Sequence, residues 1–342
     1  MATTQENTDM DTLAKLESVQ QQYATEAAKR FRTDGLKQFV ELKDAPEDRF
    51  RGLAEDPWAD HAALNSQNPI QDDTTYKFLI LGTGFGGLLF AVRLIERGAA
   101  TADQIRFLDA AGGFGGTWYW NRYPGLHCDV ESYTYLPLLE ETGYVPENKY
   151  ASGAEIRKYA ERIAEKWNLT DKALFRATAK SVGWNDEAQT WTAKVVEGRG
   201  PGEQPRERSV RAQYVLVAPG VLTKPQIPRI SGLESFQGEF IHTARWNYAV
   251  SGGSPEDPTL AGFEGKRVGI IGTGATAIQA VPIVAKYAKE LFVFQRTPSS
   301  VTWRGQKQTD PEEFKREIAH KKGWRELTPY VPYFPLPSLG VS

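Results

Sequence analysis

The feature that most constrains the fold is a unit of strand, glycine-rich loop and helix that occurs twice along the chain. In the first unit, the apolar run Lys77–Leu81 precedes the loop Gly82-Thr83-Gly84-Phe85-Gly86-Gly87 and a helical segment. The second unit starts 190 residues later, where Arg267–Ile271 precedes Gly272-Thr273-Gly274-Ala275-Thr276-Ala277. Buried apolar strands that alternate with helices are typical of a parallel sheet covered by helices. We therefore predict an α/β fold with two Rossmann-like dinucleotide-binding domains.

The first loop has the pattern GxGxxG. Its first glycine allows a tight turn, its second lets the backbone approach a pyrophosphate, and its third lets the helix pack on the strand. With 31 glycines in 342 residues, this spacing arises by chance roughly 0.25 times in such a chain, so a glycine-rich turn without a ligand is the alternative. Asp109 ends the next strand, Ile105–Leu108, at the place where an acidic side chain binds ribose hydroxyls. The context therefore favours a dinucleotide site.

The second loop has the related pattern GxGxxA, and the strand after it ends in Gln295-Arg296-Thr297 without an acidic residue. An arginine and a hydroxyl at this place accommodate a 2′-phosphate, so we predict NADPH rather than NADH. A solvated Arg296 without a ligand is the alternative. Two nucleotide sites predict hydride transfer from NADPH to a bound flavin. Disulfide reductases share this layout, but they need a redox pair of cysteines, and Cys128 is the only cysteine.

Composition excludes several other classes of function. The 41 Lys and Arg nearly balance the 43 Asp and Glu, which leaves a formal charge of −2 and no basic excess for nucleic acid. No apolar run approaches the roughly 20 residues of a membrane span, and the polar amino terminus does not resemble a signal peptide. One cysteine and four histidines without ligand spacing predict no metal site. We expect a cytoplasmic protein.

The length predicts two main domains and an amino-terminal extension. We place the extension at residues 1–75, the FAD-binding domain with a small β-hairpin at 76–222, and the NADPH-binding domain with the start of a helical insertion at 223–342. The extension begins with a predicted helix over residues 10–43, which we expect to dock on the body; a partner-binding coiled coil is the alternative. Apolar side chains recur along this helix at Leu13, Leu16, Val19, Tyr23, Ala27 and Phe31. Residues 44–73 are expected to wrap the body and to bury Phe50, Leu53, Trp58 and Leu64.

The segment between the two units carries the pattern F-x-G-x-x-x-H-x-x-x-W at Phe236, Gly238, His242 and Trp246. Its chance expectation in this chain is on the order of 0.0004. The chain resembles type I Baeyer–Villiger monooxygenases, although Asn247 follows where that family has Pro or Asp. Related flavin-containing N- and S-oxygenating monooxygenases have Tyr or Phe at the position of Trp246. The tryptophan therefore favours the Baeyer–Villiger branch, with N- or S-oxygenation as an alternative.

A second segment, residues 115–132 (GGTWYWNRYPGLHCDVES), resembles the same family nearly residue for residue. The resemblance implies that Asp129 is the active-site carboxylate, which pairs with a catalytic arginine, and that His242 acts through conformation; a loop-capping role for Asp129 is the alternative. The implied FAD contacts are Gly82, Gly84, Phe85, Gly87, Asp109, Thr117, Trp118, Tyr119, Trp120, Asp129, Val130 and Tyr135. The implied NADPH contacts are His127, Cys128, Asp129, Gly272, Thr273, Gly274, Ala275, Thr276, Ala277, Ile278, Gln279, Arg296 and Thr297.

The resemblance also implies a reaction. Such a protein uses FAD, NADPH and O2 to insert one oxygen atom next to a ketone carbonyl, giving an ester or lactone. The long extension resembles members that act on bulky cyclic or polycyclic ketones, which suggests secondary metabolism. The family's catalytic arginine lies later than any arginine of this chain, so we expect a carboxy-terminally truncated form. The alternative is a non-catalytic nucleotide-binding remnant.

Overall fold

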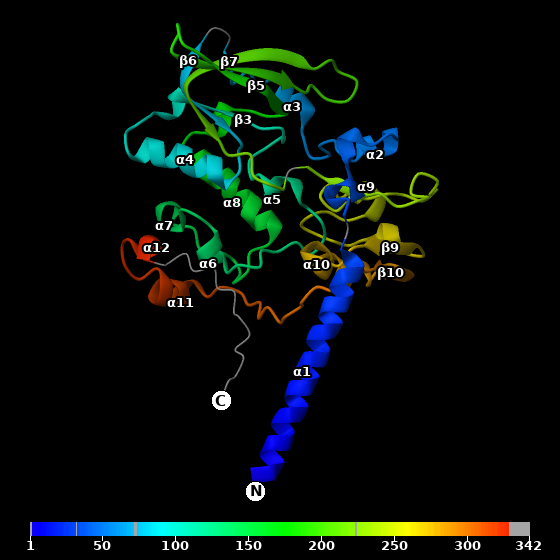
Figure 1. Cartoon of the computed structure of the whole chain (residues 1–342). Helices are drawn as coiled ribbons and strands as arrows, with labels where there is room; N and C mark the ends of the chain where they lie inside the picture. Colours follow the sequence, from blue (N-terminus) through cyan, green and yellow to red (C-terminus); the bar gives the residue numbers. More distant parts are fainter. Residues whose placement is uncertain (1, 32, 72–73, 223, 328–342) are drawn as a thin grey trace.

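A six-stranded sheet forms one layer of the larger body and lies at its upper end in Figure 1. The computed structural model describes residues 2–31, 33–71, 74–222 and 224–327. The strand order is β4-β3-β2-β7-β6-β5, in which β2, β3, β4 and the carboxyl half of β7 run parallel. The bounds are β2 (Thr75–Leu81), β3 (Ile105–Leu108), β4 (Ala173–Leu174), β5 (Ala177–Asn185), β6 (Thr190–Glu197) and β7 (Arg206–Val217). The predicted first strands and the predicted hairpin are therefore confirmed.

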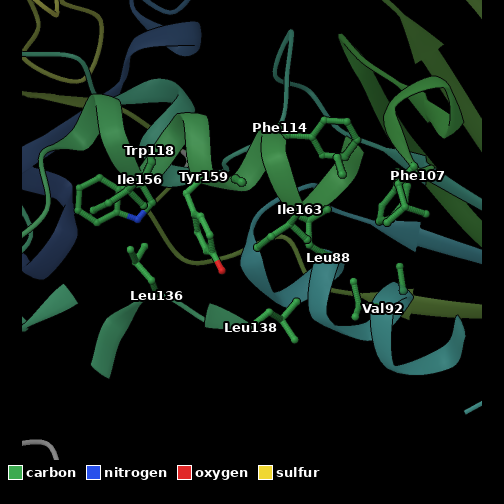
Figure 2. Close-up of a cluster of buried hydrophobic side chains, with 14 of the residues drawn as sticks. Leu88, Val92, Phe107, Phe114, Trp118, Leu136, Leu138, Ile156, Tyr159 and Ile163 are labelled. Atoms are coloured by element: carbon green, nitrogen blue, oxygen red, sulfur yellow. The ribbon is translucent and has the colours of Figure 1, made fainter. Parts of the chain in front are cut away.

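Two helices cover one face of this sheet and form the main core with it (Figure 2). Helix α4 (Phe85–Glu96) follows the first glycine loop, and α8 (Gly153–Lys166) begins where Ser152 accepts the backbone N–H of Glu155. The fully buried side chains include Leu88, Val92, Phe107, Ile156 and Ile163. Each such side chain contributes about 1.5–3 kcal/mol through burial. The helices therefore fix the first glycine loop against a rigid support.

The second unit forms a smaller module. Strands β9 (Arg267–Ile271) and β10 (Glu290–Phe294) pair in parallel, and α10 (Ala275–Val284) connects them. Only these two strands pair here within the described residues, and β10 is mostly exposed. The module's own core contains Trp246, Leu260, Phe263, Ala280 and Val284. The α/β class and the second strand–loop–helix unit are thus as predicted.

The amino-terminal extension differs from its prediction. Helix α1 (Ala2–Arg30) ends well before residue 43, and it projects away from the body (Figure 1). Leu13, Leu16, Val19 and Tyr23 are 47–67% exposed, so the expected docking of this apolar face is wrong for the described residues. The rest of the extension does wrap the body, with Phe50 buried and Leu53, Trp58 and Leu64 partly buried. Its elements are η1 (Gly35–Gln38), β1 (Phe39–Glu41), η2 (Leu42–Asp44), α2 (Asp48–Gly52) and α3 (His61–Asn65).

Strand β7 has a buried arginine near its start and an exposed end. It begins at Arg206, and Arg208 is buried beside Glu197. Near its end, Tyr214 and Val217 are 55% and 69% exposed. The reason is that pairing with β6 stops at Ala212, so only β2 lies beside the last residues of β7.

Short elements complete the fold and connect its parts. Strand β8 (Gln226–Pro228) pairs antiparallel with β1, so the extension contacts the segment between the two units. After β10, the chain returns to the first body, where Phe314 and Trp324 join the main core. These last elements are α11 (Pro311–Glu313), a π-helical turn (Phe314–Ile318) and α12 (Trp324–Leu327); residues 328–342 lie outside the described residues. The remaining short helices are η3 (Ala102–Gln104), α5 (Thr117–Trp120), α6 (Ser132–Tyr135), α7 (Leu139–Thr142), η4 (Thr170–Lys172), α9 (Tyr248–Ser251) and η5 (Ala261–Phe263).

Candidate nucleotide sites and their junction

The first glycine loop is closed by backbone on several sides. Gly82 has φ +116°, and a Cβ there would lie 2.1 Å from the carbonyl oxygen of Ala218. A Cβ on Gly87 would lie 2.1 Å from the carbonyl oxygen of Gly82, and one on Gly116 would lie 2.9 Å from the Cα of Gly84. No side chain caps α4 at Gly84. The free N–H groups of that helix end, in a cradle only glycines can form, fit a pyrophosphate.

Asp109 is hydrogen-bonded to Thr83 of the first glycine loop. Its Oδ2 accepts hydrogen bonds from the Thr83 backbone N–H at 2.7 Å and from Thr83 Oγ1 at 2.8 Å. Its Oδ1 accepts from the Ala111 backbone N–H at 2.9 Å. A carboxylate offers about four acceptor positions, so these three bonds leave capacity for a hydroxyl. The ribose contact itself stays a prediction.

The aromatic residues expected to surround the flavin lie in two separate clusters. Trp118 donates from Nε1 to the Tyr135 hydroxyl at 2.8 Å, and both belong to the main core region. Tyr119 and Trp120 instead pack with Ala111 against Trp58 of the extension. From the sequence, all of these side chains were expected to surround one flavin. The division follows from helix geometry, since three consecutive helical residues cannot all point to one side.

Sequence reasoning missed the polar groups behind these aromatics. Asp56 of the extension accepts hydrogen bonds from the Tyr119 hydroxyl and from the Gly112 backbone N–H, each at 2.9 Å. The guanidinium of Arg245 lies 3.6 Å from the centre of the Trp120 ring. Burial lowers the pKa of Arg245 to about 10, so the side chain remains a cation at neutral pH. Its position directly before Trp246 was the available signal.

The fingerprint segment is tied to the extension. Arg49 donates to the carbonyl oxygens of Phe236 at 2.7 Å, Leu233 at 2.9 Å and Glu234 at 2.6 Å, and its guanidinium lies 5.0 Å from the Phe240 ring. A Cβ on Gly238 of the fingerprint would lie 2.5 Å from the Phe236 ring. The first half of the fingerprint therefore serves as a support for the extension in this structure.

His242 and Trp246, in the second half of the fingerprint, make hydrogen bonds within the protein. His242 accepts the Ala244 backbone N–H at Nδ1, and its Nε2 faces the Gln226 carbonyl oxygen, each at 3.2 Å. This arrangement requires a neutral ring with its proton on Nε2, and burial lowers the pKa of His242. Trp246 is buried and donates from Nε1 to Ser251 Oγ at 2.9 Å. These contacts suit a histidine that acts through conformation rather than as a base.

The second glycine loop is open. Gly272 has φ +106°, and a Cβ on Gly272 or Gly274 would have no neighbour within 4 Å. No side chain caps α10 at Gly274. Thr273 donates from Oγ1 to the Thr297 carbonyl oxygen at 3.0 Å. The loop therefore combines a free helix end with space for an anionic ligand.

Two residues predicted to contact NADPH contact each other across the junction of the modules. Gln279 of α10 donates from Nε2 to the His127 carbonyl oxygen, and its Oε1 accepts the His127 backbone N–H, each at 3.0 Å. Arg296, predicted to bind a 2′-phosphate, donates from Nη1 to Gln38 Oε1 of the extension at 2.5 Å.

Asp129 lies beside this junction and has an arginine partner. Arg304 Nη2 lies 2.6 Å from Asp129 Oδ1. The neighbouring Cys128 is buried, and burial raises its pKa to about 11. Val130 is exposed. The family resemblance implied an arginine partner for Asp129 but did not point to Arg304, which comes from a segment 175 residues further along.

The described residues offer neither a metal site nor a membrane span. Among them, no group of three or more His, Cys, Asp or Glu side chains is arranged to hold a metal ion. No described helix is both long and apolar enough to span a membrane.

Comparison with known proteins identifies the family. Residues 129–318 match the FMO-like, flavin-binding monooxygenase-like family. The chain is 64% identical over 312 residues to the polycyclic ketone monooxygenase of Thermothelomyces thermophilus, covering 91% of this chain and 48% of that protein. A solved structure of the polycyclic ketone monooxygenase from Thermothelomyces thermophila superposes with a TM-score of 0.89 at 63% identity, covering 92% of this chain and 50% of that one.

A more distant solved structure has a similar fold. An oxidized steroid monooxygenase bound to NADP superposes with a TM-score of 0.59 at 35% identity, covering 72% of this chain and 44% of the other. The chain thus spans about half the length of the curated relatives it matches. From its glycine loops, its fingerprint and this match, the chain belongs to the flavin-binding monooxygenase-like family.

Proposed function

We propose that the protein takes part in the Baeyer–Villiger oxidation of a bulky cyclic or polycyclic ketone, with FAD and NADPH as cofactors and O2 as co-substrate. The observation that carries the proposal is the junction, where Asp129 lies next to the contact between His127 and Gln279. The names of the relatives support the substrate class, and Trp246 supports this branch over N- or S-oxygenation.

In this proposal, the chain's residues bind and orient the cofactors. The uncapped start of α4 would hold the pyrophosphate of FAD, and Asp109 would order the loop and accept a ribose hydroxyl. The uncapped start of α10 would hold the pyrophosphate of NADPH. When bound, the pair supplies hydride transfer and oxygen activation. Asp129, paired with Arg304, would orient a group at the junction.

Ketone binding and a cytoplasmic location belong to the same proposal. A free, buried Cys128 supports a reducing compartment. Partners other than the ketone and O2 are not proposed.

The experiment uses the 342-residue chain. We expect the purified protein to retain FAD, seen as flavin absorbance after gel filtration, and to bind NADP+ in calorimetry. With NADPH, O2 and a polycyclic ketone, mass spectrometry should detect an ester or lactone containing one added oxygen. Binding of both nucleotides without product would favour the nucleotide-binding remnant, and binding of neither would refute the proposal.

A further inference from the structure

The segment after β10 is bound to the first body by a short ladder in which residues 147–150 pair with residues 306–309. We call this ladder, together with residues 304–305 directly before it, the clip. Two backbone bonds of 2.9 Å form the ladder, from the Lys149 N–H to the Lys307 carbonyl oxygen and from the Thr309 N–H to the Glu147 carbonyl oxygen. The Gln306 side chain adds two more, accepting the Tyr150 N–H at 3.0 Å and donating to the Tyr150 carbonyl oxygen at 2.8 Å. The clip therefore holds this returning segment in one register.

Arg304 is the residue of the clip that reaches the junction. Its side chain is 28% exposed, whereas that of Asp129 is 63% exposed, so the cation is the more buried partner. Its guanidinium also lies 5.8 Å from the centre of the Tyr150 ring. The other cations of the clip have partners of their own, since Lys149 pairs with Glu131 at 2.9 Å and Lys307 with Glu313 at 3.5 Å.

We propose that Arg304 is a positioning residue for Asp129, and that the clip holds Arg304 in place to do this. An unpaired carboxylate on an exposed turn would sample many orientations. A cation fixed by a four-bond ladder selects one of them. The cofactor role of the junction rests on the proposed function, but the pairing itself does not.

Cys128 provides a probe that needs no cofactor. It is the only cysteine of the chain, it is 5% exposed, and it precedes Asp129 directly. Its rate of modification by a thiol reagent therefore reports how often the 128–130 turn opens. Arg304→Gln should raise this rate about two- to fivefold, the range expected for one exposed ion pair. Arg304→Lys should restore most of the protection.

Charge effects cannot imitate this result. Arg304 lowers and Asp129 raises the pKa of the Cys128 thiol, although burial is the larger effect. Removing Arg304 by itself would therefore reduce the thiolate and slow the modification. Faster modification then reports opening of the turn.

The decisive comparison is made in an Asp129→Asn background, where Arg304→Gln should have no further effect. An equal acceleration in that background would mean that Arg304 supports the fold independently of Asp129, and the proposal would be wrong. No acceleration in the wild-type background would also overturn it. Arg316→Gln is the matched control, because Arg316 is exposed and pairs with its neighbour Glu317.

A second variant tests the clip. Gln306→Ala removes both side-chain bonds to Tyr150 and should accelerate modification by up to the about two- to fivefold expected for Arg304→Gln, with no further effect in the Arg304→Gln background. An unchanged rate would refute the role of the clip. Added NADP+ tests the proposed function separately: it should protect Cys128 in the wild type. Absence of protection, together with an Arg304→Gln effect, would reject the nucleotide site and leave the positioning role intact.

Discussion

The two glycine loops share a pattern but not an environment. The first is enclosed, since a Cβ on Gly82 or Gly87 would lie 2.1 Å from a backbone oxygen. The second is open, with nothing within 4 Å of a Cβ on Gly272 or Gly274. The first loop lies on a six-stranded sheet and the second on a pair of strands. The same glycines are thus required by packing in one loop and, in the other, only by the backbone angle or by a ligand.

The largest expected effect comes from placing one methyl group in each loop. Gly87→Ala forces a Cβ against the Gly82 carbonyl oxygen, which should lower the free energy of unfolding by about 1–3 kcal/mol. Gly274→Ala, at φ −74°, should leave it unchanged or raise it by about 0.4–1 kcal/mol. Urea unfolding of both variants measures the difference. Equal losses would show that the second loop is enclosed in solution.

A side chain placed in the open second loop should weaken binding of its predicted ligand. Gly274→Val introduces a side chain whose Cβ has no atom of the described protein within 4 Å, so stability should change by less than about 0.5 kcal/mol. Affinity for NADP+ should fall about tenfold or more, because the backbone can no longer approach the pyrophosphate. Calorimetry measures this. Gly183→Ala, also in open space, is the control and should bind NADP+ normally.

A smaller effect should separate the two nicotinamide nucleotides. Arg296→Ala removes the cation predicted to meet the 2′-phosphate, together with its bond to Gln38. We expect NADPH to bind up to about fivefold more weakly while NADH is unaffected, as for the loss of one exposed ion pair. Fluorescence titration with both nucleotides decides this. Equal losses for the two would assign Arg296 to the extension alone.

The smallest expected effect concerns the segment between the loops. Because burial lowers the pKa of His242 in the folded state, the neutral ring stabilises the fold above the unfolded-state pKa of about 6.5. That stability should be lost progressively as the pH falls below this value. His242→Asn, which retains an acceptor for Ala244, should weaken this dependence. Thermal unfolding between pH 5 and 8 measures it, and identical pH profiles would contradict the assignment.

Local sequence patterns predicted the bounds of the strands well but the exposure of apolar side chains poorly. Ile105–Leu108 and Arg267–Ile271 were found with their observed bounds, because a short buried run between turn residues has few alternatives. The apolar face of α1 was expected to dock, yet amphipathic spacing alone does not say what covers it. The exposure of Tyr214 depends on where the partner strand β6 stops, which the sequence of β7 does not contain.

In the candidate site, too, some residues could be predicted from local patterns and others could not. The glycines and Asp109 were recognised because their roles follow from spacing within one unit. Arg304 and Asp56 were missed because each acts on a residue far away in the chain: Arg304 on Asp129, 175 positions earlier, and Asp56 on Tyr119, 63 positions later. Side-chain partners at such distances follow from the fold rather than from any local pattern.

The contact between Gln279 and His127 has an evolutionary consequence. At residue 127, Gln279 binds only the backbone N–H and carbonyl oxygen, which every amino acid except proline offers. The side chain at that position can therefore change under selection, while the two modules stay joined in the same way. A lineage can thus vary the chemistry of its junction without rebuilding the architecture that supports it.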